Sequence, residues 1–315
     1  MTAALSTATA TTITAPAFNS CLMDRFISYL DTSSKTVETY KTSLRQFFSF
    51  LTGKCIANPQ REDILAYKEE LKATGHKPTT VQNYITAIRI FFSWTAQEGL
   101  YPNIAQHVKG AKISREHKKD SLTSTQVKDV LSSIDTATEQ GKRDFAILSL
   151  MVTCGLRDIE VQRADIEDLR TLGDFTALYI QGKGREEKTE YVKVPYEVEK
   201  ALRAYLKARG TTDSKAPLFS SLDHKSKGTR LSTRSVSRIA KQAFRAVGLD
   251  SERLTAHSLR HTAVTLSLMG GNSLEETKEF ARHRDISTTM IYNHALDKAK
   301  NNCSNTVANY IFGGK

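Results

Sequence analysis

The sequence AHSLRHTA, at residues 256–263, decides how the second half of this chain is interpreted. A helix is predicted from His257 to Met269, and His257 and Arg260 project from the same face of it because they are three residues apart. Two cationic side chains at a helix N-terminus are unfavourable unless an anion binds there, and helix N-termini favour phosphate. The stretch therefore indicates a phosphate site, although surface helices often carry the same H-x-x-R spacing without any function.

A metal site is the alternative interpretation of this stretch, since His257 and His261 are four residues apart on the same helix. No third ligand is evident nearby, and Arg260 would repel a divalent cation unless a carboxylate or phosphate lay between them. The sequence also lacks the H-E-x-x-H, P-loop and G-x-S-x-G motifs and the paired carboxylates of a two-metal nuclease. We therefore expect no bound metal and no other cofactor.

The sequence FARHRDISTTMIYNHA follows at residues 280–295 and places Tyr292 nine residues after His283. A phenol oxygen can attack a phosphodiester and conserve the energy of the broken bond in a phosphotyrosine, so rejoining requires neither ATP nor metal. Most tyrosines only pack in a core or an interface, and the chain contains 11 of them. Tyr292 therefore becomes a candidate nucleophile through its neighbours and not by itself.

The chain between residue 121 and these motifs is predicted to be mostly helical with one small sheet. The β-rich segments FTALYIQ at 175–181 and TEYVKV at 189–194 flank GKGREEK at 182–188, which predicts a β-hairpin with its tip in GKGREEK. Capping residues and glycines delimit the expected helices, which run over 123–134, 143–153, 195–208, 233–247 and 273–282.

The region from residue 21 to 107 is predicted to be a separate bundle of four helices. Apolar residues recur at helical spacing over 35–51 and again after Pro78. Two shorter helices are expected over 22–30 and 62–73, and four helices of this length form a small bundle.

The segments on either side of this bundle have a different composition. Residues 108–120 are basic and show no hydrophobic periodicity, so they are predicted to be a linker, either a solvated hinge or a segment that crosses a DNA backbone. Residues 1–20 are rich in Thr and Ala and contain no charged residue, which predicts a disordered tail. An organellar transit peptide is the alternative, and the absence of arginine in the tail argues against it.

The composition narrows the possible partners. The 315 residues include 45 Lys and Arg against 34 Asp and Glu, a net charge of +11 at pH 7, which favours a polyanion. The four cysteines lie far apart without a C-x-x-C pair, so neither a disulfide framework nor a cysteine zinc site is predicted, and a reducing compartment fits best. No run approaches the roughly 18–20 apolar residues of a membrane span, so we expect a soluble cytoplasmic protein.

Four fragments, taken together, resemble the tyrosine site-specific recombinases, also called the lambda-integrase family. GLRDIE at 155–160, GKGREEK at 182–188, HSLRH at 257–261 and ARHRDISTTMIYNH at 281–294 occur in the order and approximate spacing of that family. The resemblance extends from about residue 20 to the end of the chain. It implies a mainly α fold with a small antiparallel sheet, with a helical core-binding domain over 21–107 and an α/β catalytic domain over 121–315.

The resemblance implies six catalytic residues, which are Arg157, Lys183, His257, Arg260, His283 and Tyr292. The two arginines would clamp the non-bridging oxygens of the scissile phosphate, since guanidinium forks match them bidentately. The tyrosine would be the nucleophile and form a 3′-phosphotyrosine, and the lysine would protonate the departing 5′ oxygen. His257 would assist proton transfer to and from the tyrosine, His283 would hydrogen-bond the phosphate, and Glu160 would orient the site.

Several positions depart from the family's pattern. Ala281 and Arg282 stand where Leu-Gly usually precedes this histidine, Asp158 follows the first arginine in place of a small or apolar residue, and Lys188 occupies a position often held by arginine. None of these departures removes a catalytic residue, so they bear on the subfamily rather than on activity.

The DNA-contacting residues implied by the resemblance lie on three predicted helices. They are Lys35, Lys41, Arg45, Lys77, Thr79, Gln82, Asn83, Arg89, Arg234, Arg238 and Lys241. Lysines would mostly hold phosphates, whereas Gln82, Asn83 and Arg234 have the geometry to read base edges. The alternative for each of them is a solvated helix face.

The expected substrate is double-stranded DNA with inverted-repeat core sites, recombined through a Holliday junction by a homotetramer on paired sites. Tyr310, in the apolar run YIF, would lie in a C-terminal tail exchanged between subunits, or would pack on its own domain. Integration or excision of a mobile element in the bacterial nucleoid is the preferred role, with Xer-type dimer resolution as the alternative and accessory proteins as possible partners. A non-catalytic DNA-binding protein and a type IB topoisomerase are the remaining alternatives.

Overall fold

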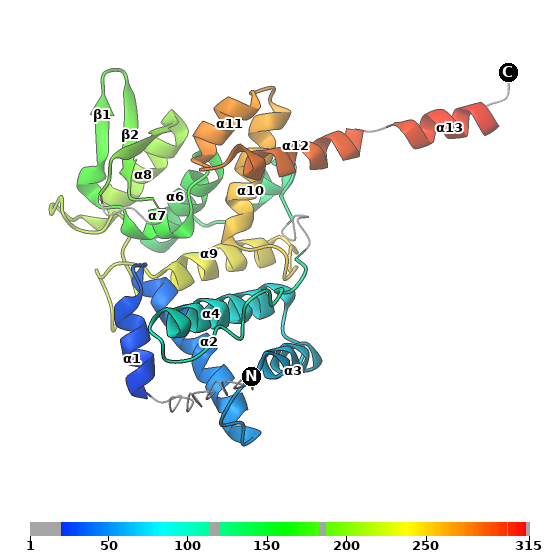
Figure 1. Cartoon of the computed structure of the whole chain (residues 1–315). Helices are drawn as coiled ribbons and strands as arrows, with labels where there is room; N and C mark the ends of the chain where they lie inside the picture. The colour runs from blue at the N-terminus through cyan, green and yellow to red at the C-terminus, as the bar shows by residue number, and fades with distance from the viewer. Residues whose placement is uncertain (1–19, 114–119, 183–186, 301, 313–315) are drawn as a thin grey trace, which may run out of the picture. The chain divides into compact units, whose positions relative to one another are not determined.

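The computed structural model describes residues 20–113, 120–182, 187–300 and 302–312, and the chain folds as two compact units, residues 1–115 and 116–315 (Figure 1). Each unit buries its own set of hydrophobic side chains. Residues 1–19 of the predicted tail and residues 114–119 of the predicted linker lie outside the described residues.

The first unit has, over residues 20–113, the four helices that the apolar spacing predicted. They are α1 (Ser20–Tyr29), α2 (Ser34–Gly53), α3 (Arg61–Ala73) and α4 (Pro78–Gln97). Helix α2 begins where the side chain of Ser33 accepts a hydrogen bond from the Thr36 amide, and Pro78 occupies the first turn of α4. Local capping and the apolar stripe agree here, which is why the bundle was predictable.

The core of the first unit is strongly aromatic. Phe26 of α1, Phe47 of α2 and Phe91 and Phe92 of α4 are all fully buried. The Phe26 and Phe91 rings meet edge to face with their centroids 5.3 Å apart. Packing of this unit continues beyond residue 107, where the sequence predicted its end, because Val108 is also buried in the core.

The second unit is mainly helical with one small sheet, as the sequence predicted. Its elements are α5 (Ser124–Ser132), α6 (Glu139–Thr153), α7 (Asp158–Arg163), η1 (Ile166–Asp168), β1 (Leu169–Leu172), β2 (Phe175–Ile180), β3 (Glu190–Val194), α8 (Tyr196–Arg209), α9 (Thr233–Ala246), α10 (Ala256–Met269), α11 (Leu274–Ala281), α12 (Ile286–Lys300) and α13 (Cys303–Phe312).

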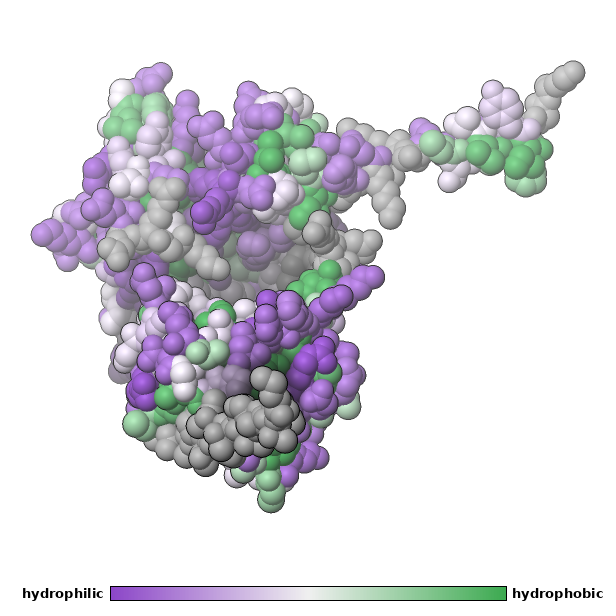
Figure 2. All heavy atoms as spheres, in the orientation of Figure 1, coloured by the Kyte–Doolittle hydropathy of each residue, from purple (hydrophilic) through white to green (hydrophobic). Residues whose placement is uncertain are grey.

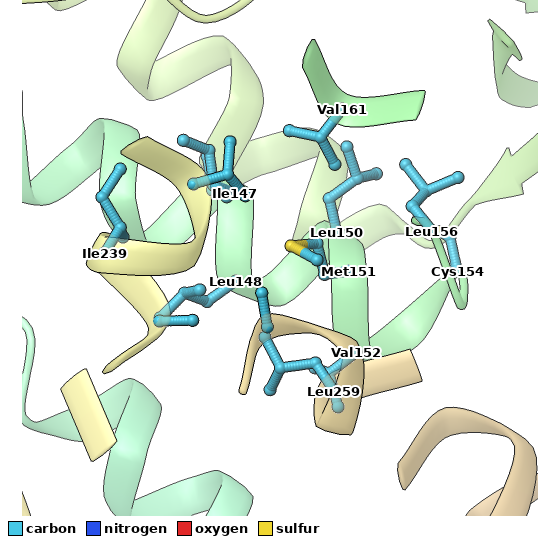
Figure 3. Packing of buried hydrophobic residues seen from close by; sticks show 14 of the residues in the cluster. Ile147, Leu148, Leu150, Met151, Val152, Cys154, Leu156, Val161, Ile239 and Leu259 are labelled. Atoms are coloured by element: carbon cyan, nitrogen blue, oxygen red, sulfur yellow. The ribbon is translucent and has the colours of Figure 1, made fainter. Parts of the chain in front are cut away.

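Helix α6 forms the centre of the second core. Its residues from 146 to 152 are all buried, and Figure 3 shows Ile147, Leu150 and Met151 packed among side chains of neighbouring elements such as Val161 and Leu259. A stretch of helix that is apolar on every side is packed all round by its neighbours. Its C-terminal end therefore fixes the position of the segment that follows, residues 154–157.

The sheet is antiparallel with the strand order β1-β2-β3. Strands β2 and β3 are the predicted hairpin and pair Thr176 with Val194 and Ile180 with Glu190. Strand β1 was not predicted, because the four residues LRTL are too short for an alternation to be recognised. Residues 183–186 at the hairpin tip lie outside the described part of the chain.

Helix α13 is the most exposed hydrophobic element that the structure describes. It has no buried residue, and Tyr310 and Phe312 are 88% and 82% exposed. Figure 2 shows the hydrophobic side chains gathered along this helix. None of the described helices has the length and apolar character that a bilayer crossing requires.

Candidate active site

Arg157 stands at the junction between the central helix α6 and the short helix α7, where it is the residue before the first turn. Its backbone N–H donates to Glu160 Oε2 at 2.8 Å, and its Nη1 donates to Glu160 Oε1 at 2.6 Å. Glu160 is completely buried. Burial alone would raise the pKa of this carboxyl, but the charges of Arg282 and Arg157 and the bond from the Arg157 amide hold it below its usual value.

Gly155 makes the turn before Arg157 possible. Its φ of +59° lies in the left-handed region that favours glycine, and a Cβ built there would lie 3.2 Å from the Phe280 ring. The turn at residues 154–157 can therefore approach the segment 280–282 closely. These two segments carry Arg157 and precede His283, so their contact brings distant parts of the sequence into one site.

Arg260, on the first turns of α10, connects the same two segments. It is 2% exposed; its Nη1 donates to Gly155 O at 2.5 Å, and its Nη2 donates to Ala281 O. Burial lowers the pKa of its guanidinium to about 9, with the positive charge of Arg157 adding to the shift. The side chain still carries its charge at neutral pH and lies between the two segments.

Tyr292, on α12, is 6% exposed, and its hydroxyl is hydrogen-bonded to Nδ1 of His261 on α10. Burial raises the pKa of the phenol, and the charges of Arg260 and Arg157 oppose that shift. Its ring stacks on His283, with the centroids 6.3 Å apart. The hydroxyl therefore stays protonated at neutral pH and lies among cationic groups that favour its ionised form.

His283 follows α11, and its Nδ1 lies 2.9 Å from the hydroxyl of Thr289. Burial, together with the charges of Arg260, Arg157 and Arg282, lowers the pKa of the imidazole to about 4. A ring that stays neutral at pH 7 has one nitrogen that donates and one that accepts. His283 can therefore donate a hydrogen bond to a phosphate oxygen without carrying a charge.

An open cavity of about 890 Å³ lies at this cluster, and the described residues that line it include Arg157, Arg282, His283 and Gly182. Gly182 is the last described residue before the hairpin tip, and its carbonyl accepts a hydrogen bond from Arg163 Nη1 at 3.2 Å. On the other side of the tip, Lys188 Nζ lies 2.6 Å from Asp165 Oδ2. The base of the hairpin is thus held at the cavity.

The structure brings together five of the six residues that the resemblance marked as catalytic, through the contacts given above and the packing of the His257 ring on the His261 ring at 4.5 Å. The sixth, Lys183, lies outside the described residues. The histidine found on the tyrosine hydroxyl is His261, whereas the sequence assigned the exchange of that proton to His257.

Sequence reasoning considered His261 only as half of a metal pair and so missed its contact with Tyr292. The signal was nevertheless present. His261, Val264 and Leu268 follow the spacing of one helix face, and the last two pack in the small cluster around Tyr292. No three His, Cys, Asp or Glu side chains in the described part of the chain are grouped as metal ligands.

The candidate DNA-contacting residues of the first unit lie mainly on its surface. Lys35, Arg45, Lys77, Thr79, Asn83 and Arg89 are exposed, and Lys41 and Gln82 are half-buried. Gln82 Nε2 donates to the hydroxyl of Thr86 at 3.4 Å, so part of its hydrogen-bonding capacity is already used.

The candidates of the second unit share one face of α9. Arg234 and Arg238 are exposed and line an open groove of about 870 Å³ together with Lys241. Lys241 Nζ lies 2.9 Å from Asp250 Oδ1 and donates to the Ser251 carbonyl at 2.8 Å. Arg238 Nη2 lies 4.0 Å from Asp223 Oδ2, so Arg234 is the side chain of this set that presents its charge to solvent most openly.

Comparison with known proteins gives matches over both units. The phage integrase family profile matches residues 120–299, and the N-terminal SAM-like domain of phage integrases matches residues 23–99. The chain is 32% identical over 274 residues to the tyrosine recombinase XerC of Thermodesulfovibrio yellowstonii, an alignment that covers 83% of this chain and 86% of the relative.

Solved structures share the fold. The XerH site-specific recombinase, in its post-cleavage complex with a palindromic difH substrate, aligns with a TM-score of 0.67 and 22% identity over 84% of this chain and 78% of its own. A lambda integrase tetramer bound to a Holliday junction aligns with a TM-score of 0.67 and 18% identity, covering 86% and 76% of the two chains.

Proposed function

The chain belongs to the phage integrase family of tyrosine recombinases, and from this premise we propose how its own residues cut and rejoin DNA at specific sites. The observation that carries the proposal is the position of Tyr292. Its hydroxyl is hydrogen-bonded to His261, and its ring stacks on His283 beside two buried or half-buried arginines. A tyrosine held among cations is suited to attack a phosphodiester.

In the proposed reaction the Tyr292 oxygen attacks the scissile phosphorus and forms a 3′-phosphotyrosine bond, while the bond to the 5′ oxygen breaks. The phenol proton passes to a histidine, and Lys183 gives a proton to the departing 5′ oxygen. Rejoining reverses both bond changes with the 5′ hydroxyl of the partner strand. The energy of the original bond is kept in the phosphotyrosine, so the cycle needs neither ATP nor a metal ion.

Arg157 and Arg260 would bind the non-bridging oxygens, where negative charge accumulates in the transition state. A guanidinium has five N–H donors, and Arg260 uses one from each Nη on backbone carbonyls. Donors therefore remain for a phosphate. His283, held neutral by its surroundings, would add a hydrogen bond to the same group.

Two histidines share the tyrosine proton in this proposal. His261 holds the hydroxyl in the resting enzyme, and His257, packed against the His261 ring, exchanges the proton once DNA is bound. Because burial raises the pKa of Tyr292, the phenol needs such a base at the moment of attack.

We further propose that the recombinase acts as a homotetramer on paired inverted-repeat sites and exchanges strands through a Holliday junction. The lambda integrase that shares the fold was solved as a tetramer on a Holliday junction. The exposed side chains of α13, Tyr310 and Phe312 among them, would dock on a neighbouring subunit. An apolar helix face of this kind is typical of a protein interface.

Integration or excision of a mobile element is the biological role that we propose, because the residues before His283 depart from the family's usual Leu-Gly. The second candidate is resolution of chromosome or plasmid dimers. It is favoured by the 32% identity to a protein named XerC. Two recombination assays distinguish the two roles. One uses DNA that flanks the gene as the substrate, and the other uses DNA from the replication terminus of the host.

The chemistry is tested with a nicked suicide substrate, in which the cleaved end diffuses away and the covalent adduct accumulates. We expect an SDS-resistant protein–DNA adduct in the presence of EDTA, and none with Tyr292→Phe, which retains DNA binding. Tyr196→Phe is the matched control, because Tyr196 is 74% exposed and lies on α8. An adduct that persists in Tyr292→Phe would show that another residue is the nucleophile.

A further inference from the structure

Arg282 departs from the family's pattern in a way that the reaction does not explain, since glycine usually precedes this histidine. It ends helix α11 with φ 54° and ψ 45°, in the left-handed region. Glycine adopts this conformation freely, whereas a residue with a Cβ is strained there. The chain therefore holds an arginine where the backbone favours glycine, and the reason must lie in the side chain.

The guanidinium of Arg282 is inserted between the two segments that form the site. Its Nη1 donates to Phe280 O at 2.8 Å and to Cys154 O at 3.3 Å. Its Nη2 donates to Gly155 O at 2.9 Å and lies 3.0 Å from Glu160 Oε2. The side chain is 8% exposed, and its Nε is buried without a hydrogen-bond partner among the described residues.

Arg282 also contacts Arg157 from two directions. Its own carbonyl accepts a hydrogen bond from Arg157 Nη2 at 3.3 Å. Its guanidinium also acts through Glu160, because it lies 3.0 Å from Oε2, which accepts from the Arg157 amide as well, while Oε1 accepts from Arg157 Nη1. The fully buried Glu160 is thus shared between two arginines.

The sharing decides how Arg157 is directed. A carboxylate and a guanidinium prefer a bidentate pair with two parallel hydrogen bonds. If Arg282 were absent, Glu160 Oε2 would keep only the Arg157 amide as a donor and could accept the fork of Arg157 together with Oε1. The ion pair with Glu160 would then use more of the N–H donors of Arg157, and the guanidinium would be directed away from a phosphate.

We propose that Arg282 is a positioning residue for DNA cleavage, which by binding Glu160 and the Gly155 carbonyl keeps part of the Arg157 guanidinium directed at the scissile phosphate. The proposal rests on the function proposed above, because it assumes that Arg157 binds that phosphate. It explains why a strained arginine is kept where glycine would relieve the backbone.

Arg282→Gly gives opposite results under the two explanations of this residue. If the side chain has no part in cleavage, glycine relieves the strain and the enzyme cleaves at the wild-type rate or faster. If it positions Arg157, single-turnover cleavage of the suicide substrate falls, on the order of 10²-fold for a misplaced catalytic group, while DNA binding is retained. Arg282→Lys keeps the charge and is expected to recover part of the rate.

A substrate with a methylphosphonate at the scissile position separates positioning from general damage. Its missing negative charge removes the group that Arg157 serves, so the defect of Arg282→Gly should be much smaller on this DNA. Arg203→Gln is the matched control for loss of one positive charge, since Arg203 is 61% exposed and pairs with Glu199 on α8.

Each outcome has one meaning. If the wild-type enzyme forms no adduct, the proposed function fails and not this inference. If Arg282→Gly cleaves like the wild type, or is slowed equally on both substrates without recovery in Arg282→Lys, the positioning role is wrong. Should Arg282→Gly fail to fold, a double-mutant cycle of Arg282→Lys with Glu160→Gln is decisive, because coupled losses support the role and additive losses overturn it.

Discussion

The core of the first unit and the charged centre of the second, formed by Glu160, Arg260 and Arg282, are both largely buried, yet they are built from opposite kinds of side chain. In the first, Phe47 and Phe91 are fully buried and pack against other aromatic rings. In the second, Arg260 is 2% exposed and Glu160 is not exposed at all. The first region is held by apolar contacts, and the second is held by ion pairs and hydrogen bonds between charged groups.

The difference affects how each region responds to change. An apolar core is stabilised by area, without direction, so the loss of one ring removes contact area and leaves a cavity. A buried charge has lost its hydration and depends on a few directed bonds, so removal of one partner leaves the other uncompensated. We therefore expect mutations in the first unit to affect stability alone, and mutations in the charged centre to affect the chemistry as well.

The largest expected effect is on stability, from Phe91→Ala in α4. Removing a fully buried phenylalanine ring should destabilise the first unit by about 3–5 kcal/mol, through lost burial and the cavity left behind. The measurement is urea unfolding followed by tryptophan fluorescence. The single tryptophan of the chain, Trp94, is 3% exposed in this same core, so the signal reports on the first unit.

Ser93→Ala is the matched control for Phe91→Ala, because Ser93 is an exposed residue on the same helix. It should leave the fluorescence midpoint nearly unchanged. If Phe91→Ala also left it unchanged, the aromatic cluster would not be the source of this unit's stability, and the contrast between the two regions would be lost.

Arg260→Met should lower the rate of adduct formation by about 10²–10³-fold, the effect of removing one donor that stabilises a developing oxyanion. The volume of the side chain is nearly kept, and circular dichroism of the whole chain should show that the second unit is still folded. Single-turnover cleavage at saturating enzyme measures the effect. An Arg260→Met enzyme that cleaves at the wild-type rate would mean that the buried arginine is structural.

The same contrast separates what the sequence could predict from what it could not. Val81, Ile85, Ile88 and Phe92 repeat at helical spacing, and this alone predicted α4 and the face that it buries. The hairpin was predicted from two β-rich segments, and the resemblance supplied the names of the residues that meet in the second unit. Local patterns are enough where each helix buries one regular stripe.

Several contacts inside the charged centre were not predictable, because they join residues more than 100 positions apart. Arg260 and Gly155 are such a pair, and so are Arg282 and Glu160. A left-handed arginine and a histidine on the tyrosine hydroxyl have no local signature beyond a polar residue within an apolar stripe. The sequence showed Arg282 as a departure from a pattern, and only the fold gives that departure a role.

Mutation of an exposed arginine of the second unit should affect DNA binding, and neither stability nor the rate of cleavage. Arg234→Gln, on the open face of α9, should weaken binding to the specific site by about 1–3 kcal/mol if the side chain reads a base. Its effect on DNA of unrelated sequence should be small, and the pre-bound complex should cleave normally. Titration of both DNAs at two salt concentrations is the measurement, and equal losses on both would mark a phosphate contact.

The smallest expected effect is on the pH dependence of stability. It distinguishes the two regions without a mutation that unfolds either one. The pKa of His283 is about 4 in the folded enzyme, against 6.5 for an ordinary histidine, chiefly because of burial and then because of the nearby arginines. Between pH 6.5 and 4 the unfolded chain therefore binds a proton that the folded chain does not. The stability contributed by the neutral ring is present above this window and is lost as the pH falls through it.

The measurement compares unfolding at pH 7 and pH 5, with circular dichroism for the whole chain and Trp94 fluorescence for the first unit. We expect acidification to destabilise the second unit more than the first, and His283→Gln to remove part of that difference. The effect is modest because the ring is half-buried and solvent screens its charge. The pKa of the Glu160 carboxyl is lowered, so the stability that its ionised form contributes is lost only when the pH falls below the ordinary range of a carboxyl. Glu160 therefore does not titrate between pH 7 and pH 5. If the pH response were unchanged in His283→Gln, the neutral His283 ring would not be its source.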